Sequence, residues 1–210
     1  SASRPASVSA SHAAMPLVEM TVGEALRQQA RKRGDATALI FADDEIDYAT
    51  LDSQVDVLAR ALIALGIQAG CRVAVMSPNA VEWVLLEYAL ARIGAVMVTV
   101  NPAFRSQELG YLLGQGKVSA LFAVRAYRRA DTAEDIAALL PDLAEADPVA
   151  GRRGKAFPEL HHVVMLDDSE LAGALTFHAL LALADGVPLE VLHARVAEVR
   201  PDDVMQIQYT

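Results

Sequence analysis

The sequence has a single cysteine, Cys71, and only 5% of its 210 residues are aromatic. One cysteine excludes an intrachain disulfide framework and is typical of a reducing compartment, so we expect a cytoplasmic protein. Basic residues are also few: the sequence has 18 Lys and Arg against 27 Asp and Glu, which gives a formal net charge of -9. A protein that coats nucleic acid needs a basic surface for the phosphates and aromatic side chains on which the bases stack. We therefore expect no nucleic acid among the partners.

Long uncharged apolar runs are missing as well. The best candidate, residues 83–100, is interrupted by Glu87, Arg92 and Gly94, whereas a membrane-spanning helix needs about 20 nearly uncharged residues. We therefore expect no integral membrane span. Residues 1–16 are rich in Ser and Ala and have no apolar centre, so we do not expect them to be a secretory signal. A transit peptide can share this composition, but we interpret the segment as a disordered tail.

The sequence does contain enough apolar material for a sizeable core, since 53% of its residues are hydrophobic. Three short runs, 72–76, 95–100 and 120–124, are apolar on both faces and alternate with helical patterns at 79–93 and 106–113. Doubly buried strands that alternate with helices predict an α/β fold with a mostly parallel sheet and helices on both faces.

The N-terminal region predicts two helices and an antiparallel hairpin. Thr21 and Glu24 form a capping-box pattern that begins a helix ending at Gly34. Apolar runs at 38–41 and 46–48 flank an acidic turn and predict the β-hairpin. We expect Thr50 to cap a second helix that ends at Gly66, and Asn79 to cap the third.

The second half of the chain is less regular. We expect an exposed excursion at 146–158, where Pro and Gly cluster, and a loose connection at 187–199. The other predicted elements are helices at 131–140 and 171–183 and strands at 161–166 and 204–210.

The motifs of common active sites are incomplete in this chain. Gly110, Gly114 and Gly116 follow a predicted helix rather than a strand, so neither glycine-rich phosphate-binding fingerprint applies. His161 and His162 are neighbours on a strand and point to opposite faces, which does not suit one metal ion. Ser77 lacks the Gly-x-Ser-x-Gly frame of a nucleophilic serine. The residues alone therefore predict no catalytic group and no metal ligand.

The sequence contains two local clusters of basic residues, although the chain as a whole is acidic. One comprises Arg125, Arg128 and Arg129, and the other comprises Arg152, Arg153 and Lys155. In an acidic protein such clusters are usually solvated surface, and we interpret both in this way. Anion binding is the alternative for each.

The order and spacing of the segments resemble the beginning of the adenylate-forming acyl-CoA synthetases, over residues 17–210. The strand-like ending Gln206–Thr210, preceded by Asp202 and Asp203, is similar to the approach to that family's phosphate loop. This ending and Asn101–Ser106 look closest to the medium-chain fatty acyl-CoA synthetase branch. The remaining segments that carry the resemblance are Thr21, Tyr48–Leu51, Gly66, Arg72–Met76, Pro78–Asn79, Glu82–Trp83, Gly94–Ala95, Val100–Pro102 and Glu108–Leu109.

The resemblance implies an ATP-dependent ligase that adenylates a fatty acid or another small carboxylic acid and transfers the acyl group to coenzyme A, with Mg²⁺ as cofactor. It implies further that residues 17–210 are an N-terminal subdomain, an incomplete fragment whose partner is the missing C-terminal part of the same protein. Tyr209 and Thr210 match the start of the phosphate loop and are the candidate ATP-binding residues. We expect the fragment alone to be inactive and to leave an apolar face uncovered, and we allow a homo-oligomer.

Two other interpretations remain open. The chain could be an α/β ligand- or partner-binding module without catalysis, since folds of this class host many functions. It could also belong to a related adenylate-forming enzyme that loads a carrier protein instead of coenzyme A.

Overall fold

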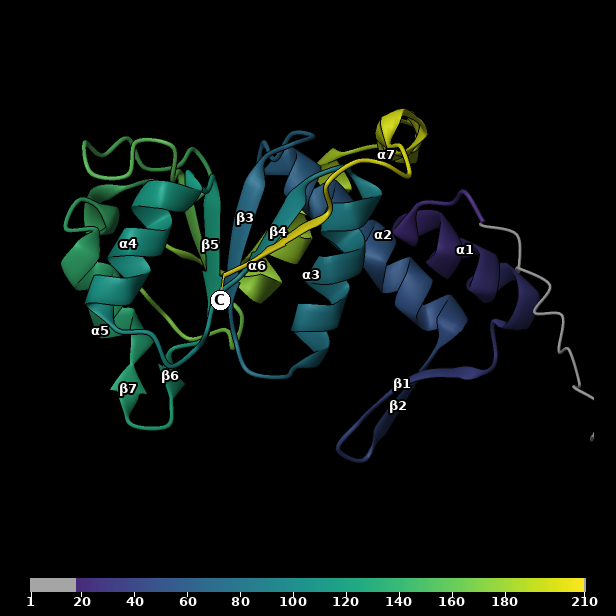
Figure 1. Ribbon diagram of the computed structural model, residues 1–210, viewed down its shortest axis with the longest axis horizontal. Coiled ribbons are helices and arrows are strands. Elements are labelled where there is room, and N and C mark those ends of the chain that lie inside the picture. Colours follow the sequence, from purple (N-terminus) through teal and green to yellow (C-terminus); the bar gives the residue numbers. More distant parts are fainter. Residues whose placement is uncertain (1–17, 210) are drawn as a thin grey trace, which may run out of the picture.

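The computed structural model describes residues 18–209. The predicted tail at 1–16 and the candidate Thr210 lie outside this part of the chain. None of the helices in residues 18–209 combines the length and the apolar composition that a membrane span requires. The molecule is an α/β structure built around one six-stranded sheet (Figure 1), as the sequence pattern predicts.

The sheet has the strand order β10-β4-β3-β5-β8-β9, and every pairing in it is parallel. The order places β4 and β5 on opposite sides of β3. The direction in which successive strands are added to the sheet therefore reverses at β3. The strands are β3 (Arg72–Met76), β4 (Val96–Thr99), β5 (Ala120–Ala123), β8 (His162–Met165), β9 (Leu175–Thr176) and β10 (Gln206–Gln208).

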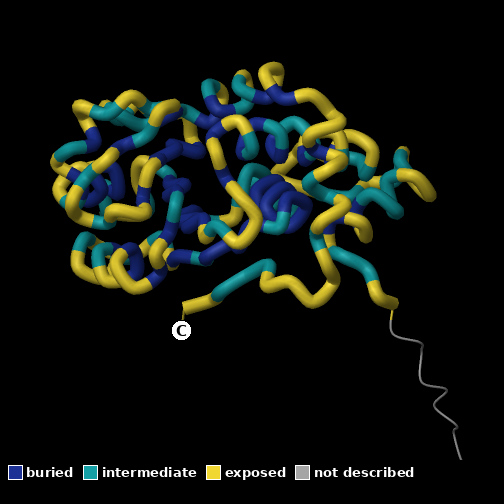
Figure 2. The backbone as a smooth tube through the Cα atoms, turned by 90° about the horizontal axis from the view of Figure 1, so that it is seen from above, coloured by how far each residue is buried: buried dark blue, intermediate teal, exposed yellow. Residues whose placement is uncertain are grey.

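Helices cover both faces of the sheet because successive strand residues point to opposite sides. Val73, Val75 and Phe122 face a core with helices α1 (Val22–Arg33), α2 (Tyr48–Ala64), α3 (Val81–Arg92), α6 (Phe177–Ala182) and α7 (Leu189–Glu198). Ala74 and Leu121 face a second core with α4 (Ser106–Gly116) and α5 (Thr132–Leu139). The buried chain accordingly lies in the centre of the molecule, and residues 200–209 run outside it (Figure 2).

The N-terminal predictions are confirmed except for the caps of α2 and α3. The capping box of α1 is formed, with Thr21 N donating to Glu24 at 2.9 Å and Glu24 N donating to Thr21 at 3.1 Å. The hairpin pairs β1 (Thr37–Phe41) with β2 (Asp44–Asp47). The N-cap of α2 is Asp47, three residues before the expected cap Thr50, because the Asp47 carboxylate accepts the Thr50 amide at 2.7 Å.

The cap predicted for α3 is wrong by one residue. The N-cap is Ala80 rather than Asn79, and it offers no side-chain acceptor to the first turn. Sequence alone favoured Asn79 because Asn is a common cap, but the extended chain after β3 continues through one more residue before it turns into the helix.

Two predictions in the second half are corrected, and several short elements there were not predicted. Residues 171–183 are not one helix: β9 joins the sheet at Leu175, and Thr176 then caps α6 through the Ala179 amide. The expected loose connection at 187–199 contains α7. A short hairpin, β6 (Ala126–Tyr127) with β7 (Ala130–Asp131), precedes α5, and 3₁₀ turns occupy Leu143–Glu145 (η1) and Leu183–Gly186 (η2).

The segment 146–158 is largely exposed, as predicted, but its centre is not. The Arg152 side chain is 0% exposed and forms an ion pair with Asp142 at 2.9 Å. Its guanidinium also donates to the main-chain oxygens of Ala156, Phe157 and Leu160. The interpretation of Arg152 as solvated surface is therefore wrong: it organises the loop from inside.

Candidate functional site

The carboxyl ends of the parallel strands gather polar residues at one edge of the sheet. Ser77 and Asn79 follow β3, Asn101 follows β4, Arg125 follows β5 and Asp167 follows β8. In doubly wound sheets, ligands bind outside the carboxyl ends of the strands, where the chain changes direction. This edge is therefore the place to look for a site.

The loop from Asn101 to Ser106, between β4 and α4, is fixed by its own hydrogen bonds. Asn101 Oδ1 accepts the Ala103 amide at 2.9 Å, and Arg105 N donates to Glu108 Oε2 at 3.1 Å. The Arg105 side chain then reaches across to Asp135 of α5, with Nε 2.6 Å from Oδ2. Hydrogen bonds within the protein thus hold the loop at both of its ends.

Asp135 is the buried carboxylate of this anchor. Arg105 donates to it, and Ser106 Oγ donates as well. The hydrogen bond from Arg105 is the main reason that the pKa of Asp135 is lowered from its ordinary value of 3.8, against the opposing effect of burial. The carboxyl group is therefore held ionised as a structural counter-ion rather than as a proton donor.

Tyr209, one of the two sequence-predicted site residues, continues β10 at this edge beside β4. The residue is 37% exposed, and a Cβ at Gly116 would lie 3.5 Å from the Tyr209 hydroxyl oxygen. The Tyr209 hydroxyl therefore reaches the end of α4. Thr210 lies outside the described residues, so the expected pair of ATP-binding residues is placed only in part.

An apolar groove of about 440 Å³ lies between Tyr209 and α4. Phe104, Tyr111 and Leu112 supply its apolar surface, and Gln107 and Glu108 supply polar groups. Tyr111 is 66% exposed. Sequence analysis did not identify these residues as a group, although their spacing on one helix was visible. Their meeting with Tyr209 depends on the pairing of β10 with β4.

The other sequence candidates have structural roles or face solvent. Ser77 is buried, and its hydroxyl donates to the Pro78 carbonyl at 2.9 Å rather than to a catalytic base. His161 is exposed and His162 buried, and burial lowers the pKa of His162. Arg125, Arg128 and Arg129 are exposed around the β6–β7 hairpin.

The glycine candidates and the described acidic and histidine residues form neither a phosphate-binding loop nor a metal cluster. Gly110, Gly114 and Gly116 lie inside α4 and not in a loop after a strand, so they offer no cradle of free amides. This also corrects the expectation that they follow the helix. In residues 18–209, no three His, Cys, Asp or Glu side chains are placed to hold a metal ion.

The fold and the polar edge define a class: doubly wound α/β proteins that bind ligands at the carboxyl ends of their strands. Comparison with known proteins identifies the family within this class. The model of the AMP-binding enzyme family matches residues 26–210. The chain belongs to the AMP-binding enzyme family.

Individual relatives agree with this assignment. YngI of Bacillus subtilis (strain 168), named as an acyl-CoA synthetase, is 33% identical over 92% of this chain and 36% of its own length. The mitochondrial medium-chain acyl-CoA ligase ACSF2 of Danio rerio is 28% identical over 93% of this chain and 32% of its own length. This chain therefore spans about a third of the length of the curated relatives it matches.

Solved structures share the fold. The anthranilate CoA ligase AuaEII, crystallised with anthranoyl-AMP, superposes with a TM-score of 0.70 at 19% identity, over 93% of this chain and 32% of that one. The similarity supports the same path of the backbone through the sheet and its helices.

Proposed function

We propose that this chain is the N-terminal part of an ATP-dependent fatty acid–CoA ligase. In this reaction a carboxylate attacks the α-phosphate of ATP and pyrophosphate leaves. The thiol of coenzyme A then attacks the acyl carbonyl and AMP leaves. The observation that carries the proposal is the family match over residues 26–210, and the names of YngI and ACSF2 support the acyl-CoA class.

The division of labour within the whole protein follows from what this chain contains. Residues 17–210 supply the sheet, the anchored loop before α4 and the strand β10, which Tyr209 follows. Tyr209 and Thr210 border the ATP phosphates in this proposal, and Mg²⁺ and most ligand contacts are supplied by the C-terminal part of the same protein. Mg²⁺ would neutralise charge on the transferring phosphoryl group.

The substrate in this proposal is a fatty acid, and coenzyme A is the acceptor. ACSF2 is named for medium-chain acids, which supports this class over other carboxylates. A cytoplasmic location and a homo-oligomer remain predictions from the sequence, and ACSF2 itself is named as mitochondrial.

ATP–pyrophosphate exchange on the full-length protein, with a panel of fatty acids, tests the adenylation step. We expect exchange that depends on both Mg²⁺ and a fatty acid, and none from the 210-residue chain alone. If the full-length protein shows no ATP–pyrophosphate exchange with any carboxylic acid in the panel, the proposal is refuted. Exchange catalysed by the 210-residue chain alone would refute the assignment of the ligand contacts to the C-terminal part.

The acceptor is tested separately, by offering coenzyme A or a phosphopantetheinylated carrier protein to the adenylate. Release of acyl-CoA supports the ligase. Acylation of the carrier protein without acyl-CoA would assign the protein to the carrier-loading class instead.

A further inference from the structure

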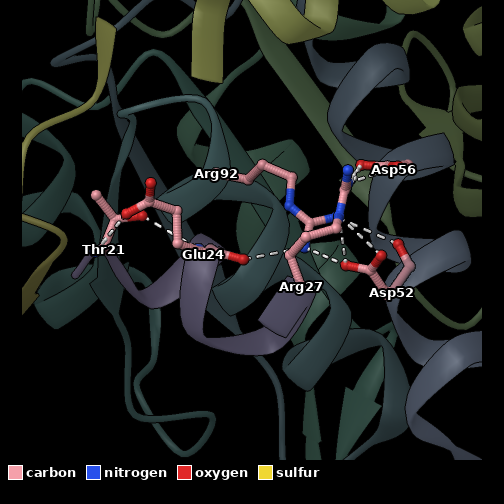
Figure 3. A network of polar contacts seen from close by, with 7 residues as sticks. Thr21, Glu24, Arg27, Asp52, Asp56 and Arg92 are labelled. Carbon is pink, nitrogen blue, oxygen red and sulfur yellow. Dashed lines mark hydrogen bonds and ion pairs between the residues drawn. The ribbon is translucent and has the colours of Figure 1, made fainter. Parts of the chain in front are cut away.

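Four charged side chains connect the first three helices (Figure 3). Arg27 of α1 lies 2.9 Å from Asp52 Oδ2 and 2.6 Å from Asp56 Oδ1, both on α2. Arg92 of α3 pairs with the same two carboxylates, with Nη1 2.7 Å from Asp56 Oδ1. Each carboxylate therefore receives two guanidinium groups, one from α1 and one from α3, and the four charges sum to zero.

Arg92 is the buried centre of this cluster, with a side chain only 2% exposed. It also donates to the main-chain oxygens of Asp52, at 3.2 Å, and Gly23, at 3.3 Å. A Cβ at Gly23 would lie 3.1 Å from the Arg92 Cα, so α1 approaches α3 closely at this point. Arg92 thus binds α1 both through its carboxylate partners and directly through the backbone.

Helix α1 has little apolar attachment of its own. Its only buried residues are Gly23 and Leu26, whereas α2 buries six. Helix packing normally rests on a buried apolar face. We therefore attribute the position of α1 mainly to the charged cluster.

The beginning of α1 and the segment that leads into β10 line one small cavity. Met20, Thr21 and Val22 line a small cavity of about 70 Å³ together with Ala91 and Gly94 and with residues of the segment 199–205. Directly after the residues that line this cavity, the Met97 amide of β4 donates to the Met205 oxygen at 2.9 Å, and the pairing of β10 with β4 begins. The beginning of α1 therefore borders the same cavity as the segment that leads through β10 to Tyr209.

We propose that Arg92 is a positioning residue: it fixes α1 against α2 and α3, and α1 in turn holds the 199–205 segment so that β10 carries Tyr209 to the carboxyl edge of the sheet. The link to ATP rests on the function proposed above. The mechanical coupling from Arg92 to β10 does not depend on that function.

Hydrogen–deuterium exchange of the 210-residue chain tests the coupling. In Arg92→Met we expect amides in both 22–33 and 199–208 to exchange at least about tenfold faster, since a buried ion pair has lost one partner. Amides of β5 and β8 should keep their protection. Arg92→Lys keeps the positive charge but loses the bidentate hydrogen bonding of the guanidinium. Both segments should therefore be better protected from exchange in Arg92→Lys than in Arg92→Met.

The matched control is Arg152→Met, which removes another buried arginine on the opposite side of the sheet. It should speed exchange in 142–160 and leave 199–208 unchanged. Faster exchange in 22–33 without any change in 199–208 would overturn the proposal, and so would equal loss of protection in 199–208 in the control.

Arg27→Met keeps the test valid if Arg92→Met does not fold. The Arg27 side chain is 27% exposed, and its removal leaves Arg92 paired with both carboxylates. We expect a smaller increase in exchange, again in both segments together. Because the readout needs no ATP and no fatty acid, its failure is distinguishable from failure of the proposed ligase activity.

Discussion

Two buried arginine side chains, Arg92 and Arg152, hold separate parts of this molecule together. Each is paired with carboxylate oxygen and with main-chain carbonyl oxygen. A buried guanidinium is costly to desolvate, and the cost is offset only when its donors are used. Both residues therefore act as structural cations, and neither is free to bind a ligand anion.

Arg152→Met tests this at the loop 142–160. The change removes hydrogen bonds to three carbonyl groups and leaves Asp142 unpaired, so we expect a loss of about 3 kcal/mol in the free energy of unfolding. Urea denaturation followed by circular dichroism measures it. Arg153→Met, at the exposed neighbouring position, is the control and should change stability by less than about 0.5 kcal/mol. Equal effects of the two variants would contradict the structural role.

Asp135 makes a pH-dependent contribution to stability. Its folded-state pKa is lowered, chiefly by the hydrogen bond from Arg105. A carboxyl group of this kind stabilises the fold above its unfolded pKa, and the contribution is lost as pH falls through the lower folded pKa. We therefore expect stability from Asp135 to be complete at pH 7 and to decline below about pH 4.

Asp135→Asn should lower the free energy of unfolding at pH 7 by about 1–2 kcal/mol. It should also reduce the stability difference between pH 7 and pH 3, as measured by urea titrations at both values. Asp43→Asn, in the exposed turn of the first hairpin, should change neither quantity by a comparable amount. An unchanged pH dependence in Asp135→Asn would show that the anchor contributes nothing.

Sequence analysis predicted Tyr209 as a site residue from resemblance, and this stays a prediction; it could not place the pairs that build the edge. Arg105 and Asp135 are 30 positions apart, and only the folded loop brings them together. Arg152 was assigned to the surface because its neighbours are basic. The fold gives the reason that Gly154 is a glycine: a Cβ there would lie 1.8 Å from Arg152 Nη2, so Gly154 makes room for the buried guanidinium.

At the scale of elements, the turn between α3 and β4 depends on Gly94. Its φ is +73°, and a Cβ there would lie 3.3 Å from Val199 Cγ2. Gly94→Ala should therefore cost at least about 1 kcal/mol in thermal or urea unfolding. Gly186→Ala is the control, because a Cβ there meets nothing within 4 Å. A neutral Gly94→Ala would show that this turn tolerates a side chain.

The elements predicted well are those with a strong physical pattern. Strands β3, β4 and β5 are buried on both faces, and their continuous apolar runs are unmistakable. Strand β9 has two residues, too few for any periodicity. Helix α7 buries only Leu192, so its apolar pattern is weak, and its helical state depends on packing against α2.

At the scale of the whole molecule, the described chain leaves apolar surface open. The groove beside Tyr209 exposes Tyr111, and Val204 before β10 is also exposed. The uncovered apolar face expected from the sequence stays a prediction, and we propose the groove between α4 and Tyr209 as its place. Exposed apolar patches of this kind bind partners or dyes.

The 210-residue chain should accordingly enhance the fluorescence of an apolar dye such as ANS. Tyr111→Asp places a charge in the groove and should reduce the enhancement by roughly half. Leu189→Asp, at an exposed apolar position on α7 outside the groove, should leave most of the fluorescence enhancement unchanged. Equal reduction by both variants would indicate unspecific dye binding.

The parallel pairing of β10 with β4 also has a consequence for biosynthesis. Gln206 pairs with Met97, so an edge of the sheet is completed by residues that leave the ribosome long after their partner strand. Closing so long a loop is slow, and the outer edge of β4 stays open in the meantime. A nascent chain paused before Gln206 exposes that edge to other strands, and we expect this interval to be when the protein most needs a chaperone.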